Sequence, residues 1–467
     1  MFNFRKNTLK SKPPLKCIIV GSGKVGMALI DVLTKEGNDI TLIDQDASLV
    51  EEMTGMYDIM GLVGNGASFR IQQEAGIEDT DLLIAVTESD ELNLLCATVA
   101  KQSKKCATIA RVRTPEYSVE ANYLREQLGL TMIINPELTA AQEISRLLTL
   151  PGALEVTDFA HGQAQLIRVK IVAGSPLIGM TVAEYARSYG DPMLFCAVER
   201  DDKVFIANGD FLFREHDIVA FVCDYKQSRL CLSHIGISSG SIKNCLIVGG
   251  GKASYYLSSF LLANHIDVKI IERDHARCEF LSENLPKAII IHGDGTDESL
   301  LHEEDLTTTE AFVPLTGMDE ENIILTLHAK QVSSAKIVTK VDRFSFKNVI
   351  RSLDLGSVIY PRYLTAEAIL GYARDRRASL QSGGIITMSQ LYDQRVECIE
   401  FSVEESASSI VGKPIRTLSL KPNLIITFIN RHGKVLFPMG NDTIELGDSV
   451  MVVTTNKGFS EISDILL

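Results

Sequence analysis

The sequence of 467 residues contains no tryptophan, no long polar tract and no apolar run long enough to cross a bilayer. A spanning helix needs about 18 or more uninterrupted apolar residues, so no transmembrane segment is expected. The first residues, MFNFRKNTLKSKPPLK, are basic and lack the apolar core and cleavage site of a secretory signal. We therefore expect residues 1–15 to form a disordered basic leader.

Paired cysteines, metal-ligand spacing and excess positive charge are also missing. The nine cysteines include no CxxC pair, and an odd number without a framework predicts reduced, buried thiols. No HExxH or similar pattern occurs, so no metal site is expected. A net charge of −14 without a basic stripe disfavours nucleic acid as a partner.

What the sequence does contain is a long-range repeat. KCIIVGSGKVG at 16–26 returns as NCLIVGGGKAS at 244–254, 228 positions further along the chain. TLIDQD at 41–46 then matches KIIERD at 269–274, and VTESDELNLL at 86–95 matches LTGMDEENII at 315–324. Several motifs at a nearly constant offset indicate a tandem duplication.

Each half changes character partway along. Its first part alternates apolar strands with amphipathic helices, which predicts a parallel sheet with right-handed crossovers. Its second part has short alternating strands and few helices, which is typical of a small α+β lobe. We predict an α/β fold with two Rossmann-like parallel-sheet nucleotide-binding lobes, each followed by a small α+β C-terminal lobe. With turn-rich segments as boundaries, the predicted parts are the leader 1–15, N-lobe 1 (16–152), C-lobe 1 (153–238), N-lobe 2 (239–384) and C-lobe 2 (385–467).

The first half carries a complete dinucleotide fingerprint. Gly21, Gly23 and Gly26 fit G-x-G-x-x-G between a predicted strand and a predicted helix. Such glycines allow a tight turn, close approach of a pyrophosphate and close helix–strand packing, and the helix N-terminus attracts the phosphates. Asp44 ends the next strand, where a carboxylate binds ribose hydroxyls and repels a 2′-phosphate. NAD(H) is therefore favoured over NADP(H) at this site.

The second half departs from this fingerprint. It keeps Gly249 and Gly251 but has Ser254 at the third glycine position and Glu272 in place of Asp44. Because a serine adds a side chain where helix and strand approach most closely, either a functional site or a purely structural copy is compatible with these residues.

The residues for a reaction are not evident in either half. Hydride transfer needs a substrate pocket with a positioned acid or base, and no such constellation stands out in the C-lobes. No P-loop, GxSxG elbow or kinase signature occurs. A duplicated nucleotide module suits a sensor that changes shape on binding, so we expect a regulator and no enzyme. An NAD-dependent oxidoreductase with an unrecognised pocket and a non-nucleotide scaffold are the alternatives.

The ordered set VGSGKVG, TLIDQD, GNGAS, AVTESDELN, ARVR and INPE resembles the signature of RCK domains, the regulators of K+ conductance. The tandem order, from about residue 16 to the C-terminus, resembles the peripheral regulatory subunits of bacterial potassium-uptake systems. The resemblance implies a cytoplasmic regulator on the inner face of the plasma membrane that binds NAD(H), or ATP and ADP at the same sites. It also implies a homo-oligomeric ring, with a tetramer expected, beneath an integral-membrane potassium channel subunit of the Trk type.

The resemblance also assigns binding positions. In N-lobe 1 these are Gly21, Ser22, Gly23, Lys24, Val25, Asp44, Thr87, Glu88 and Arg111. In N-lobe 2 the matching positions are Gly249, Gly250, Gly251, Lys252, Ala253, Glu272, Thr316, Gly317 and Lys340. Pro314 and Lys340 are departures from the family pattern, like Ser254. The helices that open at Pro136 and Pro361 are the candidate linkers to the channel. Which nucleotide acts as effector, and in which direction it gates, stays open.

Overall fold

The computed structural model describes residues 14–467 except 104, 191–192, 238–239, 241, 343–346, 354, 380–383, 393–394, 405–406 and 408. These residues fall into two compact units. Unit 1 comprises the chain up to Pro136 together with Arg362–Ala373, and unit 2 comprises Glu137–Pro361 and Arg374–Leu467. Within the described part of the chain, no helix has both the length and the apolar character needed to span a bilayer.

Unit 1 is built around a six-stranded sheet in the order β3-β2-β1-β4-β5-β6, and all of its strand pairs are parallel. Its strands are β1 (Lys16–Val20), β2 (Asp39–Asp44), β3 (Met60–Val63), β4 (Leu82–Ala85), β5 (Ala107–Arg111) and β6 (Met132–Ile134). Its helices are α1 (Lys24–Lys35), α2 (Ala47–Met56), α3 (Phe69–Glu74), α4 (Asp90–Ala100), α5 (Pro115–Val119) and α6 (Ala121–Gln127). This strand order reverses direction between β1 and β4, which is where ligands bind in open α/β sheets.

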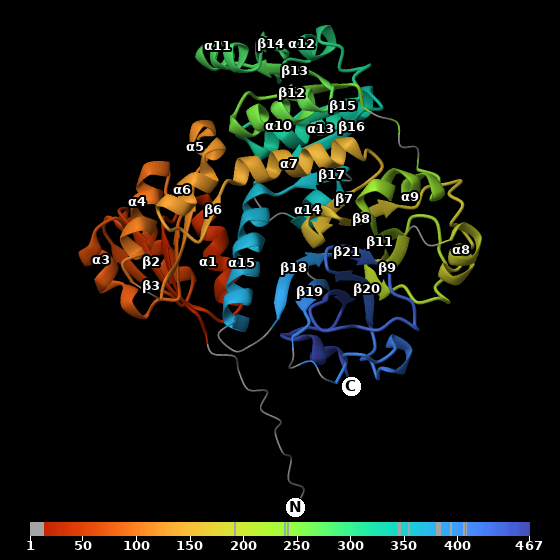
Figure 1. Cartoon of the computed structure of the whole chain (residues 1–467). Helices are drawn as coiled ribbons and strands as arrows, with labels where there is room; N and C mark the ends of the chain where they lie inside the picture. Colours follow the sequence, from red (N-terminus) through yellow and green to blue (C-terminus); the bar gives the residue numbers. More distant parts are fainter. Residues whose placement is uncertain are drawn as a thin grey trace, which may run out of the picture. The chain divides into compact units, whose positions relative to one another are not determined.

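Helices cover both faces of this sheet, which is why its strands read as continuous apolar runs. Cys17 and Ile19 of β1 pack into a core formed with α1 and α2, whereas Ile18 and Val20 pack against α3 and α4 on the other face. Figure 1 shows α1 on one side of the strands of this sheet and α3 and α4 on the other. A segment from far along the chain completes the first core. Ala366, Ile369, Leu370 and Ala373 of helix α15 (Pro361–Ser379) are buried among the residues of α1 and α2.

Unit 2 contains the second parallel sheet, with the corresponding order β14-β13-β12-β15-β16-β17. Its strands are β12 (Asn244–Val248), β13 (Asp267–Glu272), β14 (Ile289–His292), β15 (Ala311–Pro314), β16 (Lys336–Lys340) and β17 (Ser357–Ile359). Its helices are α10 (Lys252–Ala263), α11 (His275–Asn284), α12 (Glu298–Glu303), α13 (Asp319–Val332) and α14 (Lys347–Ser352), while α7 (Pro136–Thr149) joins unit 2 from Glu137 onward. Helix α7, which follows β6, therefore belongs mostly to unit 2, and the helix that follows β17 belongs mostly to unit 1.

The two remaining sheets of unit 2 are antiparallel and share one topology. The orders β10-β9-β11-β8-β7 and β21-β20-β22-β19-β18 are equivalent once the second is read from its β21 edge. The first comprises β7 (Glu155–Phe159), β8 (Ala164–Lys170), β9 (Met193–Arg200), β10 (Lys203–Ile206) and β11 (Ile218–Asp224), with helices α8 (Val182–Tyr189) and α9 (Ser228–His234). The second comprises β18 (Ile385–Leu391), β19 (Val396–Ser402), β20 (Leu424–Arg431), β21 (Lys434–Leu436) and β22 (Ser449–Thr454).

The two antiparallel sheets share a hydrophobic core. Leu166 and Cys196 from the first sheet pack in one cluster with Cys398 and Phe428 from the second. The buried hydroxyl of Tyr392 lies 3.1 Å from the Ala197 carbonyl and 3.0 Å from the Ile218 carbonyl. Since the Tyr392 hydroxyl contacts residues 195 and 174 positions earlier in the chain, the two C-lobes form one packed body.

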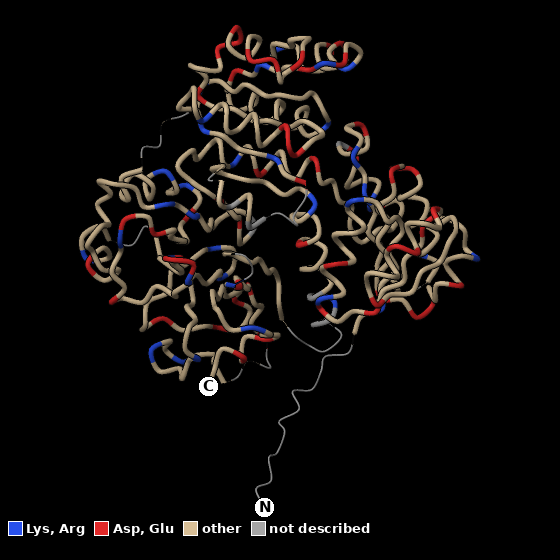
Figure 2. Tube along the Cα trace, turned by 180° about the vertical axis from the view of Figure 1, so that it is seen from behind, with Lys and Arg blue, Asp and Glu red and all other residues tan. Residues whose placement is uncertain are grey.

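These observations confirm the predicted fold class and duplication. All nine cysteines are buried and free of disulfides, as expected from their scattered positions. Residues 1–13 of the predicted leader lie outside the described residues, whereas Leu15, also assigned to the leader, is buried in the unit 1 core. The lobe boundaries near 153, 240 and 385 stay predictions. Figure 2 shows acidic and basic residues interspersed along the described trace, so the net charge of −14 is spread out.

Candidate functional site

The glycine-rich loop of N-lobe 1 joins β1 to α1 and depends on two of its glycines for shape. Gly21 has φ +103°, and a Cβ there would lie 3.0 Å from the Thr87 amide nitrogen. A Cβ at Gly26 would lie only 2.0 Å from the Gly21 carbonyl oxygen. Side chains are therefore excluded at both positions by backbone atoms, which cannot move aside as a flexible side chain can.

Gly23 has a different function in this loop. A Cβ there would meet no atom of the described residues within 4 Å, so the position faces open space. Gly23 is also the N-cap of α1, and no side chain caps the helix. The first-turn N–H groups of α1 are thus available to an anion, with the favourable end of the helix dipole behind them.

Asp44 fixes the loop from the end of β2. Its Oδ2 accepts hydrogen bonds from the Ser22 amide and the Ser22 hydroxyl, both at 2.6 Å, and its Oδ1 accepts one from the Asp46 amide at 3.0 Å. Burial opposes ionisation, but the hydrogen bonds from Asp46 and Ser22 outweigh it, so the pKa of Asp44 lies below its ordinary value. The carboxylate is therefore charged at neutral pH beside the loop.

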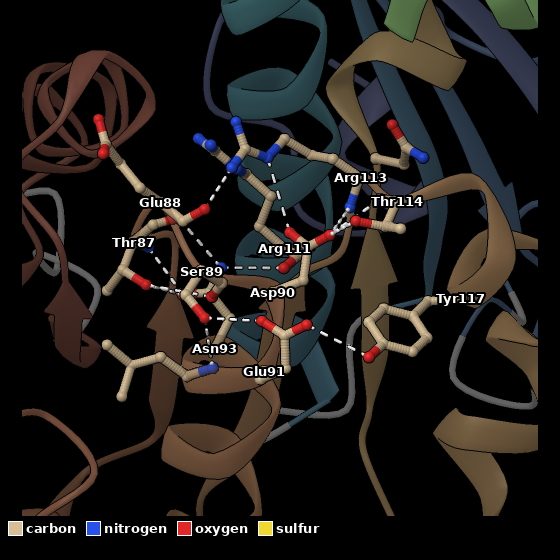
Figure 3. A network of polar contacts seen from close by, with 12 residues as sticks. Thr87, Glu88, Ser89, Asp90, Glu91, Asn93, Arg111, Arg113, Thr114 and Tyr117 are labelled. Carbon is tan, nitrogen blue, oxygen red and sulfur yellow. Dashed lines mark hydrogen bonds and ion pairs between the residues drawn. The ribbon is translucent and has the colours of Figure 1, made fainter. Parts of the chain in front are cut away.

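The ends of β4 and β5 are joined by a network around Asn93 and Asp90 (Figure 3). The Asn93 Oδ1 accepts hydrogen bonds from the Thr87 amide and hydroxyl, both at 2.7 Å, while its Nδ2 donates to the Arg111 carbonyl at 2.9 Å. The Asp90 Oδ2 accepts from the amides that follow β5, those of Arg113 at 2.9 Å and of Thr114 at 2.8 Å. The Arg113 guanidinium in turn donates to the Glu88 carbonyl.

These features meet the requirements of an adenine dinucleotide. The open position at Gly23 and the uncapped amides of α1 suit a pyrophosphate, and Asp44 suits ribose hydroxyls. Arg111, at the end of β5, adds a positive charge at the same edge of the sheet. The Val25 side chain is buried in the core, so this residue offers a ligand only its backbone N–H. Lys24 and Glu88 are exposed.

The loop of N-lobe 2 keeps the same backbone shape in spite of Ser254. Gly249 has φ +97°, and the N-cap Gly251 has φ −64° and ψ −174°, against −62° and −178° at Gly23. The Ser254 hydroxyl donates a hydrogen bond to the Gly249 carbonyl, which corresponds to the carbonyl that a Cβ would approach in the first loop. Ser254 is thus accommodated without loss of the glycine turn.

The surroundings of the second loop differ more than the loop itself. The Asn322 side chain again joins the two strand ends, since Oδ1 accepts from the Thr316 amide at 2.9 Å and Nδ2 donates to the Lys340 carbonyl at 3.1 Å. Lys340, however, forms an ion pair with Asp342 at 3.5 Å, where the first half has Arg111 and Arg113. The positive charge at this edge is therefore partly neutralised.

The structure brings the predicted residues of each half to the carboxyl edge of one parallel sheet. Glu88 and Lys24 contribute no side-chain hydrogen bond to these networks among the described residues, and Gly317 has no side chain to contribute. Sequence reasoning missed Asp90 and Asn93, which hold the edge together. The repeat carried the signal, because both halves have Asp and Asn at the corresponding positions of VTESDELN and LTGMDEEN.

Two family models match the chain, each of them twice. A TrkA-N domain model matches residues 17–136 and 245–361, and a TrkA-C domain model matches residues 166–229 and 398–467. The Trk system potassium uptake protein TrkA of Haemophilus influenzae is 30% identical over 451 residues, which is 95% of this chain and 96% of that protein. The protein of the same name from Vibrio alginolyticus is 32% identical over 457 residues, or 97% and 98% of the two chains.

Two solved structures share the fold at lower identity. The structure titled GsuK Channel superposes with a TM-score of 0.66 at 15% identity, over 95% of this chain and 77% of that chain. The structure titled GsuK channel bound to NAD gives a TM-score of 0.64 at 15% identity, with the same coverage.

Proposed function

Since this chain belongs to the family of proteins with tandem TrkA-N and TrkA-C domains, we propose that it is a nucleotide-binding regulatory subunit that gates a membrane-embedded potassium-uptake channel of the Trk type. The observation that carries the proposal is the match to TrkA proteins over nearly the full length of both chains. The two open glycine loops provide the sensing element, and the fused C-lobes provide a body on which a signal can act.

The proposed effector of N-lobe 1 is NAD(H), with ATP and ADP competing for the same loop. An ionised Asp44 accepts hydrogen bonds from ribose hydroxyls and repels a 2′-phosphate, which supports NAD(H) over NADP(H). Arg111 would face the phosphates from the end of β5. A structure with this fold whose title reports bound NAD adds support for this class of ligand.

A sensing role fits how the polar side chains of the site are used. Asp44, Asp90 and Asn93 each accept hydrogen bonds from backbone amides of neighbouring loops. These side chains therefore control the position of the glycine loop and of the strand ends, and a bound nucleotide changes the balance of those contacts. A reaction would instead require a side chain that holds or releases a proton beside the nicotinamide.

Helix α15 is the proposed transmitter of the signal. It contributes Ala366, Ile369 and Leu370 to the core of N-lobe 1, yet it precedes C-lobe 2 in the sequence. A change in N-lobe 1 therefore acts on an element covalently joined to the other half. A nucleotide shifts such a two-state equilibrium only by its differential affinity, typically 1–3 kcal/mol of coupling.

The proposed setting is a homo-oligomeric ring, with a tetramer as the expected form, attached to the cytoplasmic face of the plasma membrane through the channel subunit. A net charge of −14 favours attachment through a protein partner over direct adhesion to anionic lipid.

The proposal is tested by isothermal titration of the full chain with NADH, NAD, ATP and ADP, alongside an NADH absorbance trace. We expect saturable binding without consumption of NADH. Potassium flux through the co-reconstituted channel should then depend on which nucleotide is present. Turnover of NADH would instead favour the oxidoreductase alternative, and absence of binding by all four nucleotides would favour the scaffold.

A further inference from the structure

The two N-lobes differ at the edge where the adenosine ribose of a dinucleotide lies. This edge is formed by the end of the second strand of each sheet, the start of the following helix and the end of the third strand. Asp44 pairs with Val63 in the first sheet, and Glu272 pairs with His292 in the second, so the two edges can be compared position by position. Four neutral residues of N-lobe 1 are replaced by basic or imidazole side chains, in the pairs Gln45 and Arg273, Ala47 and His275, Leu49 and Arg277, and Val63 and His292.

Arg277 lies directly against the glycine loop. It projects from the first turn of α11, and its Nε donates a hydrogen bond of 2.5 Å to the Gly250 carbonyl in the middle of the loop. Its guanidinium carbon lies 4.4 Å from the centre of the Phe280 ring. Its Nη2 is buried and has no hydrogen-bond partner among the residues that the structure describes. Burial also lowers the pKa of Arg277, so the cation is incompletely compensated where it lies.

Glu272, beside Arg277, is already engaged by the backbone. Its Oε2 accepts from the Gly250 amide at 2.6 Å and its Oε1 accepts from the Asp274 amide at 2.7 Å. Both carboxylate oxygens thus have donors, and the Arg277 cation lies close enough to interact with the charge. The Asp44 oxygens are held by the Ser22 and Asp46 amides in the same way, so what distinguishes the second edge is the Arg277 cation beside its carboxylate.

The rest of the rim is polar and accessible. His275 and His292 lie with their rings 5.3 Å apart, and the Nε2 of His292 lies 3.1 Å from the Arg273 carbonyl. Arg273 and His275 are exposed, and the charge of Arg273 acts on Asp294 of the following loop. Arg277 is therefore a cation of this rim whose buried donor lies next to the glycine turn.

We infer that N-lobe 2 binds an adenine nucleotide that carries a phosphate on its adenosine ribose, of the NADP(H) class, and that Arg277 is the residue that selects it. An arginine at this edge accommodates a 2′-phosphate in dinucleotide-binding sheets. A phosphate provides the acceptor that the Arg277 Nη2 lacks, and the planar guanidinium matches its oxygens in a two-pronged contact. The inference rests on the proposed nucleotide-binding function and assigns different ligands to the two lobes.

The test uses the full chain in two successive calorimetric titrations. NADH is added first to saturation, and NADPH is then added to the NADH-loaded protein. We expect one NADH per chain, followed by one NADPH per chain. The Arg277→Leu variant introduces the residue found at the matching position 49, and we expect it to weaken NADPH binding by about tenfold or more. Its NADH binding should stay unchanged.

Two further variants control for charge and folding. Arg70→Leu removes an exposed arginine on α3 of N-lobe 1 and should leave both affinities unchanged. Arg277→Lys keeps the charge but loses the planar fork, so we expect an intermediate NADPH affinity. This second variant also carries the test should Arg277→Leu fail to fold.

The outcomes separate the inference from the proposed function. Two NADH bound per chain with no NADPH binding would overturn the inference and leave the proposed function in place. Arg277 would also be excluded as the selecting residue if Arg277→Leu and Arg277→Lys both bind NADPH as the wild type does. Absence of binding by both nucleotides would remove the proposed function and the inference together.

Discussion

Replacement of Gly23 by alanine should separate nucleotide binding from folding. A Cβ at Gly23 would meet no protein atom within 4 Å, and its φ of −62° is ordinary for alanine. Alanine is a poorer N-cap than glycine by about 0.5–1 kcal/mol. Because alanine also restricts the unfolded chain, which stabilises by about 0.4–1 kcal/mol, the two effects nearly cancel. The free energy of unfolding should therefore change by less than about 1 kcal/mol.

The added methyl group stands where a pyrophosphate would approach the amides of α1. We expect Gly23→Ala to weaken NADH binding to N-lobe 1 by at least about tenfold, since a lost charge-assisted hydrogen bond costs about 1.5–3 kcal/mol. Calorimetric titration measures the affinity and urea unfolding measures the stability. Gly55→Ala is the matched control, because its Cβ also meets nothing within 4 Å but lies in α2. That control should bind NADH normally.

Gly26→Ala should also weaken NADH binding, but as a consequence of lost stability. Its Cβ would lie 2.0 Å from the Gly21 carbonyl, so α1 must move away from the loop. Overpacking of this kind costs about 1–3 kcal/mol, and binding falls along with stability. The reasoning would be refuted by a Gly23→Ala protein that binds NADH within twofold of the wild type, because the ligand would then not pass over this position.

Three other changes test separate parts of the structure. Asp44→Asn should weaken NADH binding about tenfold in calorimetry, because an amide has one acceptor oxygen and cannot accept from both Ser22 and Asp46; unchanged affinity would count against this site. Burial lowers the pKa of Lys336 to about 8 from an ordinary 10.5. As the pH rises, the native state therefore loses this proton before the unfolded state does, and the free energy of unfolding increases above pH 8. Between about pH 7.5 and 10, the free energy of unfolding of the wild type, measured in urea, should increase by about 2–3 kcal/mol relative to that of Lys336→Met. Parallel pH profiles of the two proteins would contradict this. Tyr392→Phe should lower the free energy of unfolding in urea by about 1 kcal/mol, because the buried Tyr392 hydroxyl contacts two carbonyls. A stability equal to that of the wild type would show that this contact does not help to join the C-lobes.

Much of the site was predictable because its signals are local. The glycine spacing, the strand that precedes it and the acid that follows lie close together in the chain, so a glycine turn at Gly21, Gly23 and Gly26 could be recognised from sequence alone, while its binding role stays a prediction. Ser254 left the second loop ambiguous in sequence. The structure shows the same turn there, because the hydroxyl bonds to the carbonyl that its Cβ approaches.

Other parts of the site depend on partners far along the chain. Asn93 lies on a helix, yet it joins the ends of two strands, and its partner carbonyl is that of Arg111. Arg277 belongs to none of the motifs recognised in the sequence, although its side chain contacts the Gly250 carbonyl 27 positions earlier. Neither contact follows from periodicity, since periodicity describes which face a residue lies on and not what that face meets.

The sequence by itself determined the duplication, the parallel sheets and the first glycine loop. Each of these follows from apolar periodicity and turn residues, which act over a few positions and repeat at a constant offset. Only the tertiary structure decided that residues 362–373 of α15 complete the core of N-lobe 1 and that the two antiparallel sheets share one core. The apolar faces of these elements can be recognised in sequence, but burial is not directional. Which surface covers each apolar face therefore depends on the whole folded chain.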